Sequence, residues 1–122
     1  MKPQRDRRTL LADVVTACEK IEVFTAGHTF DDYAHDDQLR SAVERQFTII
    51  GEALREAWKL DRSLSAQITG FRSILNFRNV LVHGYSTVFD AAVWDVIHNH
   101  LPLLLRDLRP LFTELPPGEL PA

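Results

Sequence analysis

Apolar residues recur at the three- and four-residue spacing of an α-helix in four segments of the chain, and no segment alternates convincingly like a β-strand. The first predicted helix covers residues 7–25 and stops before Gly27. The second follows the cap at Asp36-Asp37 and continues to about Trp58, which makes it the longest. The apolar stripes of these two helices consist of Leu11, Val14, Cys18 and Ile21, then Leu39, Val43, Phe47, Ile50, Leu54 and Trp58.

The second half of the chain predicts two more helices. The third starts near Ser65 and reaches Val82 or His83, where Gly84 ends it. The fourth starts near Asp90, which has capping-box spacing from Thr87. Their apolar positions are Ile68, Phe71, Ile74, Leu75, Leu81 and Val82, then Val93, Trp94, Ile97, Leu101, Leu104, Leu105 and Leu108.

Two prolines interrupt the fourth helical pattern. Pro102 and Pro110 lack the N–H that an unbroken helix needs, so we expect a kink or break near each. Short connections between amphipathic helices place sequential neighbours antiparallel. The sequence therefore predicts an all-α, up-and-down four-helix bundle, or five helices if the C-terminal one breaks. Residues 1–114 would form one domain, and residues 115–122 a flexible tail.

Composition and charge favour an ordinary folded domain. The chain is 45% hydrophobic and 25% charged, as in ordinary globular domains. Because its net charge is −3, we do not expect broad, sequence-independent binding to nucleic acid. A local basic patch remains open, because Arg5, Arg7 and Arg8 cluster near the N-terminus. No segment is long and apolar enough for a membrane span, and the single Cys18 excludes an internal disulfide. We expect a cytoplasmic protein with Cys18 buried in the core.

A glycine and a glutamate in the second helix stand out. Gly51 costs about 1 kcal/mol relative to alanine in a helix, which predicts close approach of another helix or chain at this point. Glu52 beside it is interpreted in two ways. It either reaches a cleft or pairs with an arginine, or it is a plain surface residue.

A polar stripe runs along the third predicted helix. At about 100° per residue, Arg72, Asn76, Asn79 and His83 fall within one narrow arc. Amides, arginine and histidine suit a polar seam between two copies of the helix, an anion site, or a hydrogen-bonded structural interface. Arg78 lies about 140° away from His83 around the helix, so the two side chains do not share a face. They meet if Arg78 swings its long side chain round, if the helix unwinds, or across a twofold axis.

Metal chemistry fits the sequence poorly. His98 and His100 are two apart on a predicted helix and diverge, and no recognised zinc-ligand spacing occurs. The loop with His28, His35 and four aspartates could hold a hard cation, but it is interpreted as a solvated helix-capping loop. We expect no metal and no cofactor.

The run from Arg78 to Tyr85 resembles the motif of HEPN domains and, among them, of HepT-like toxins. That motif is an arginine, then four to six residues, then a histidine, with a tyrosine two further on; Arg78, His83 and Tyr85 match it, and Asn79 matches the polar residue after the arginine. Further similarity covers residues 50–53, Val93-Trp94 and Leu101-Pro102, and spans about residues 10–111. Phe71 departs from a common tryptophan of the family.

The resemblance implies a helical bundle that dimerises so that two motifs line one cleft, and a metal-independent ribonuclease. It also implies a type VII-like toxin–antitoxin pair, in which a minimal nucleotidyltransferase antitoxin of the MntA type transfers AMP to the motif tyrosine. Tyr85 is the matching residue here, although it could also cap the helix end or pack at the dimer edge.

The chemistry of RNA suggests roles for these residues. The 2′-hydroxyl is the nucleophile, so cleavage needs a base, an acid and positive charge at the phosphorane. We assign His83 to acid–base catalysis, Arg78 to the developing charge, and Asn79 to positioning, while Arg72 and Asn76 contact substrate or the partner copy. The substrate would be tRNA or mRNA. The alternative is a non-catalytic helical dimer that binds a nucleotidyltransferase and positions its substrate.

Overall fold

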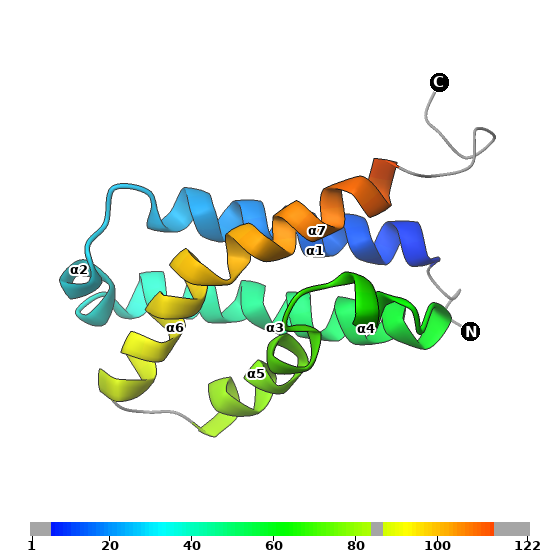
Figure 1. The fold of residues 1–122 in the computed structure, drawn as a ribbon. Helices are drawn as coiled ribbons and strands as arrows, with labels where there is room; N and C mark the ends of the chain where they lie inside the picture. Colours follow the sequence, from blue (N-terminus) through cyan, green and yellow to red (C-terminus); the bar gives the residue numbers. More distant parts are fainter. Residues whose placement is uncertain (1–5, 84–86, 114–122) are drawn as a thin grey trace, which may run out of the picture.

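The computed structural model describes residues 6–83 and 87–113 (Figure 1). Within these ranges the chain is helical and has no strand, which confirms the predicted all-α class. The helices are α1 (Arg7–Thr25), α2 (Phe30–Ala34), α3 (Asp37–Leu60), α4 (Leu64–Gln67), α5 (Phe71–His83), α6 (Thr87–Asn99) and α7 (Leu101–Thr113). The predicted tail and Tyr85 lie outside the described residues.

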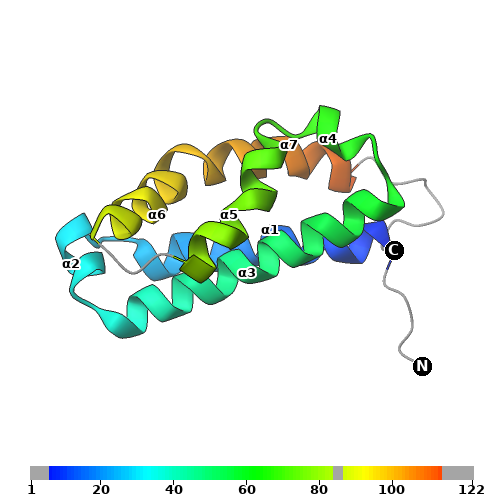
Figure 2. The ribbon, with the colours of Figure 1, turned by 90° about the horizontal axis from the view of Figure 1, so that it is seen from below.

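The two long helices α1 and α3 form an antiparallel pair that runs through the molecule (Figures 1 and 2). Both begin at aspartate caps: Asp6 accepts a hydrogen bond from the amide of Thr9 at 2.8 Å, and Asp36 from that of Leu39 at 3.0 Å. The predicted bounds 7–25 are confirmed. The predicted apolar stripes become the core of the pair, with Leu11, Val14, Ile21, Val43, Ile50 and Leu54 almost or wholly inaccessible to solvent.

Cys18 lies in this core and is fully buried, as predicted. Burial raises the pKa of its thiol to about 12, so the reactive thiolate is suppressed at neutral pH. Cys18 therefore acts as a small apolar residue in the core.

A short helix, α2, was not predicted, because five residues are too few to show a helical period. It begins with a capping box in which Thr29 and Asp32 each accept a hydrogen bond from the other's amide, at 3.1 Å and 2.9 Å. Its residue Tyr33 is fully buried and packs against Trp94 of α6, with ring centroids 5.4 Å apart. The acidic loop is thus a helix-capping segment.

The prediction of one helix from Ser65 to His83 is wrong. The chain forms α4, leaves the helical conformation at Ile68, and starts α5 after Gly70. Gly70 has φ of +67°, a left-handed conformation that glycine adopts without steric cost. The break lets α5 leave the direction of α4.

The fourth predicted helix is divided into α6 and α7. The turn at His100, just before Pro102, confirms the expected break near that proline. No break occurs at the second proline, since α7 continues through Pro110 to Thr113. One missing hydrogen bond in the last turn is tolerated there. The first part, α6, begins at Thr87, three residues before the expected start at Asp90.

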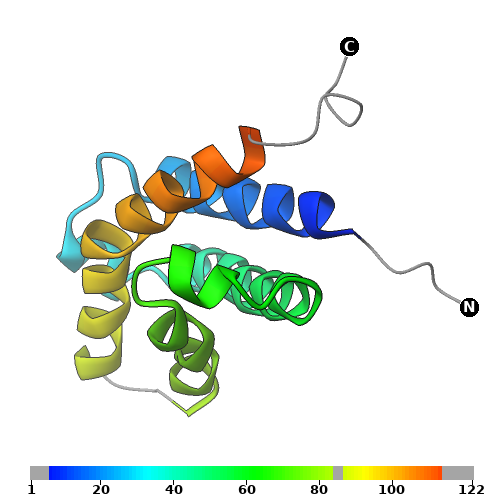
Figure 3. The same cartoon turned by 45° about the vertical axis from the view of Figure 1, so that its right-hand side comes forward.

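The helices are arranged around α3. Figure 3 shows α1 and α7 on one side of α3 and α5 on the other, and Figure 2 shows α5 running steeply across α3. Helix α7 packs along α1 and α6 packs against α2, while α5 packs mainly on α3. Among the described helices, none is both long enough and apolar enough to cross a membrane.

Candidate active site

The start of α5 is fixed by a contact from a distant part of the chain. The amide of Thr69 donates a hydrogen bond of 2.8 Å to the Asp107 carboxylate of α7, and Arg106 donates one of 3.3 Å to the Thr69 hydroxyl. Burial raises the pKa of Asp107, but the hydrogen bond from the Thr69 amide and a further one of 3.1 Å from Arg106 Nε outweigh it and hold that pKa below its ordinary value. Asp107 therefore anchors the turn from which α5 projects.

Helix α5 is covered on one side only. Phe71 is buried, and Phe77 meets Phe47 of α3 edge to face with ring centroids 5.0 Å apart. Leu75 is only partly buried, and Val80 is 42% exposed. The apolar side of α5 therefore rests on α3, while apolar surface remains exposed away from it.

Arg78 lies on the side of α5 that faces α3. A methyl group placed on Gly51 of α3 would lie 3.8 Å from the Arg78 Cβ, so the predicted close approach of a helix at Gly51 is confirmed. That distance is an ordinary contact, which means that the site does not require glycine to avoid a clash. From this crossing point the Arg78 guanidinium reaches Glu52, with Nη2 and Oε1 4.0 Å apart and both side chains about half exposed.

The predicted polar stripe lies on the other side of α5. Arg72, Asn76 and Asn79 are exposed, and helical register places them on a different side of α5 from Arg78. His83 is the last residue of α5, but its side chain lies outside the described residues, as does Tyr85. The structure thus brings Arg78 and Glu52 together and separates Arg78 from the stripe, as the helical register predicts.

Beside the start of α5 lies a hollow that the sequence did not indicate. It has a volume of about 520 Å³, and its lining includes Trp58, Phe71 and Arg72. The guanidinium of Arg62 stacks over the Trp58 ring at 3.8 Å. Arg62 follows the end of the predicted second helix, and no sequence pattern near it predicts that it stacks on Trp58. Arg72 and Arg62 together place positive charge next to an aromatic ring.

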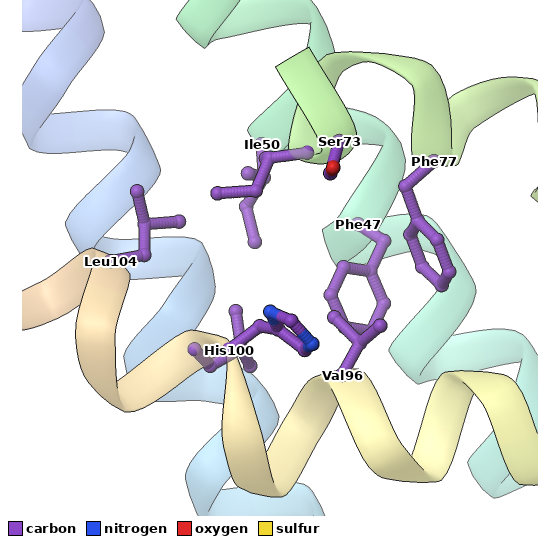
Figure 4. Close-up of a pocket in the computed structure, with 9 residues that line it drawn as sticks. Phe47, Ile50, Ser73, Phe77, Val96, His100 and Leu104 are labelled. Carbon is purple, nitrogen blue, oxygen red and sulfur yellow. The ribbon is translucent and has the colours of Figure 1, made fainter. Parts of the chain in front are cut away.

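A second pocket, of about 130 Å³, lies between α5 and the α6–α7 junction. Figure 4 shows Ser73 and His100 on opposite sides of it and the Phe47 and Phe77 rings at one end. Its other lining residues are aliphatic: Ile50, Ile74, Val96, Leu101 and Leu104. The pocket exists because α5 packs on α3 and leaves a gap toward α6 and α7.

Basic residues at the start of α1 have a structural role. Arg7 forms an ion pair with Asp61, whose carboxylate lies 2.8 Å from Nε, and so ties the start of α1 to the end of α3. Arg5 lies outside the described residues. The basic patch suggested by the N-terminal arginines is therefore not a free surface at Arg7.

No group of three or more metal-ligating side chains comes together in the part of the chain that the structure describes. In the acidic loop, His28 lies 3.6 Å from Asp32 and His35 lies 3.4 Å from Asp31, all on the surface. The aspartates Asp32 and Asp36 cap helices.

Comparison with known proteins assigns this chain to a family. The model of the ribonuclease HepT-like family matches residues 14–111, which is most of the chain. The chain belongs to the ribonuclease HepT-like family. In this HepT-like chain the match runs from α1 into α7 and includes Gly51, Glu52, Arg78 and His83.

Individual relatives agree with this assignment. A protein of Thermococcus cleftensis named "Probable ribonuclease HepT" is 31% identical over 101 residues, which cover 83% of this chain and 91% of the relative. "Putative RNase MJ0127" of Methanocaldococcus jannaschii is 25% identical over 113 residues, which cover 93% of each. "Putative RNase TTE0752" of Caldanaerobacter subterraneus is 28% identical over 102 residues, covering 84% of this chain and 90% of the relative. No solved structure gives a significant match.

Proposed function

We propose that this HepT-like chain is a metal-independent endoribonuclease whose active site is completed by a second copy of the chain. The observation that carries the proposal is the placement of the motif on α5 in a chain of this family. Arg78 packs beside α3 at Gly51, whereas the exposed residues Arg72, Asn76 and Asn79 lie on a different side of α5 by helical register. His83 belongs to that stripe by helical register. One α5 therefore presents the two halves of the motif in different directions.

A dimer through the exposed side of α5 would unite the two halves. Val80 is exposed on this side, one turn from Asn76, and α5 is otherwise half-covered. A twofold contact pairs each residue with its copy or with a nearby residue of the partner. Arg78 itself packs beside α3, but its long side chain is half exposed, so its guanidinium would have to extend to the rim of this interface to meet the His83 of the partner.

Chemically, the site needs only side chains. His83 takes the proton from the 2′-hydroxyl, whose oxygen attacks the adjacent phosphorus, and the imidazolium formed in this way gives its proton to the 5′-oxygen as the P–O5′ bond breaks. Arg78 stabilises the extra negative charge on the phosphorane, and Asn79 positions the RNA or the histidine. The products are a 2′,3′-cyclic phosphate and a 5′-hydroxyl.

RNA binding is supported by the hollow near the start of α5. Arg72 lines it, and the Arg62–Trp58 stack adjoins it. Arginine and aromatic side chains hold unpaired bases by stacking and phosphates by charge. Because the net charge is −3, the positive surface that contacts RNA would be small and local. The substrate would be a cytoplasmic tRNA or mRNA, and the folded shape of the RNA would supply the specificity.

Regulation would act through Tyr85, in a toxin–antitoxin pair with a minimal nucleotidyltransferase. Transfer of AMP to this tyrosine adds a phosphate charge and bulk next to the site and blocks RNA. Co-expression with the partner should add the mass of AMP to the intact chain, and Tyr85→Phe should abolish the addition. If no added mass appeared under any condition, this regulation would be wrong.

The nuclease itself is tested with the purified, partner-free protein. His83→Ala should lower the cleavage rate of RNA by about a hundredfold or more, while His35→Ala, at an exposed histidine of the capping loop, should not. Products should carry 2′,3′-cyclic phosphate ends, in the presence of a chelator as in its absence. If the His83→Ala protein cleaved as fast as the parent, the catalytic assignment would be wrong. A dimer that never cleaves but still binds the nucleotidyltransferase would instead support the binding-module alternative.

A further inference from the structure

The consecutive residues Gly51 and Glu52 of α3 both lie next to Arg78 of α5. Gly51 is buried at the crossing, 3.8 Å from the Arg78 Cβ when a methyl group is placed on it. Glu52, the next residue, is exposed, and its Oε1 lies 4.0 Å from Arg78 Nη2. The two neighbours therefore contact the two ends of one side chain, its base and its guanidinium.

The ion pair is poorly suited to stabilise the fold. Glu52 and Arg78 are 53% and 50% exposed, and such pairs contribute at most about 1 kcal/mol because water screens them. Arginine, however, loses about 2 kcal/mol of rotamer entropy when it is held in one orientation. A carboxylate beside a half-exposed arginine thus affects where the guanidinium points more than how stable the protein is.

Among the ion pairs described for α3, the one with Arg78 is made by Glu52. Glu56, one turn further along, lies 3.1 Å from Lys59 and is engaged there. A guanidinium has five N–H donors, and a contact through Nη2 leaves others free for phosphate oxygens. Glu52 can therefore hold Arg78 while Arg78 binds the scissile phosphate.

From these contacts we propose that Glu52 is a positioning residue: it orients the Arg78 guanidinium toward the scissile phosphate, beside the point where α5 crosses α3 at Gly51. This inference rests on the proposed ribonuclease function, because it assigns a role through Arg78. Glu52 does not touch the RNA. Its removal should therefore slow the chemical step without weakening binding, since it removes a negative charge near the phosphate.

The test compares Glu52→Ala with Glu56→Ala, which removes the same charge from the same helix one turn away. Glu52→Ala should lower kcat by about tenfold and leave KM unchanged or lower, because a misdirected catalytic group costs rate. The affinity for an uncleavable RNA with 2′-O-methyl groups should stay equal or improve. Glu52→Gln, which keeps an oxygen acceptor, should recover part of the lost rate. Glu56→Ala should behave like the parent protein in each assay.

A second measurement does not depend on activity. The ¹⁵N relaxation of the arginine Nε–H groups, with the Arg78 signal assigned by its loss in Arg78→Lys, reports how rigidly the guanidinium is held. The order parameter of Arg78 should fall in Glu52→Ala and stay unchanged in Glu56→Ala. An unchanged order parameter in Glu52→Ala would overturn the inference, as would a loss of RNA affinity equal to the loss of kcat.

Failure of the inference is distinct from failure of the proposed function. If Arg78→Ala cleaved RNA like the parent, the proposed function would be wrong, whatever Glu52 does. If Arg78→Ala were inactive while Glu52→Ala matched Glu56→Ala in rate, the function would stand and the positioning role would be refuted.

Discussion

The α1–α3 pair and helix α5 differ in how their apolar residues are covered. In α1 and α3 the apolar stripes are closed against each other, with Val14, Ile21 and Leu54 fully buried. In α5, by contrast, Phe71 is the one buried residue among those whose side chains are described, and Val80 is exposed. The first region stabilises one chain by itself. The second carries the family motif and retains apolar and polar surface for a further contact.

The largest expected difference is in stability. Leu54→Ala should lower the free energy of unfolding by about 3 kcal/mol, because it opens a cavity in the closed interface. Leu75→Ala, at a half-covered site of α5, should cost about 1 kcal/mol. Urea denaturation at low protein concentration measures both. Equal costs would mean that α5 is as tightly packed as the α1–α3 pair, and the contrast would be lost.

The next effect concerns association. Val80→Asp should weaken the proposed dimer by about a hundredfold or more, since it would bury an unpaired charge at the interface. Val23→Asp is the matched control, because Val23 is 73% exposed on α1. Sedimentation equilibrium of both variants gives the dissociation constants. If Val23→Asp dissociated the dimer and Val80→Asp did not, the interface would lie on the α1 side.

A smaller effect is expected where the two regions meet. Gly51→Ala should raise the free energy of unfolding by up to about 1 kcal/mol, because alanine favours the helix and its methyl group meets Arg78 Cβ at an ordinary distance. Ribonuclease activity should be kept. Thermal unfolding and cleavage assays measure the two quantities, and a loss of stability would indicate that α5 or a second copy lies closer to Gly51 than this contact.

The smallest effect depends on pH and concerns Glu44, on α3. Burial raises the pKa of Glu44, nearby Asp90 of α6 raises it further, and Arg40 opposes them. A raised pKa means that the fold favours the protonated form, so this contribution is present below the ordinary value of 4.5 and is lost as pH rises through the raised value. Glu44→Gln should therefore raise Tm by about 1–3 °C at neutral pH. The gain should vanish below pH 4.5, and Glu56→Gln should show no such gain.

The parts of the fold that sequence predicted are those governed by local signals. The bounds of α1 and the length of α3 follow from aspartate caps and long apolar periods, which neighbouring residues determine. The break at Gly70 was missed because the apolar period continues across it. Its turn is held by Asp107, 38 positions away from Thr69, which no local pattern reveals.

The candidate site was predicted to a similar extent. Helical register separates Arg78 from the stripe of Arg72, Asn76 and Asn79, and in the structure these three side chains are exposed. The register of one helix does not determine which side of α5 packs on α3, so the contact of Arg78 with Gly51 and Glu52 could not be predicted from the sequence. The Arg62–Trp58 stack was missed for the same reason, since it depends on how the chain turns after α3.

The central claim is that one active site draws Arg78 from one protomer and His83 from its partner. It is tested most directly by mixing two inactive proteins, Arg78→Ala and His83→Ala, under conditions that exchange subunits. A mixed dimer then contains one site with both residues intact and one with neither. Ribonuclease activity should return, to about half that of the parent for each mixed dimer. If the mixture stayed as inactive as its components although mass spectrometry showed mixed dimers, both residues would act within one protomer, and the shared site would be refuted.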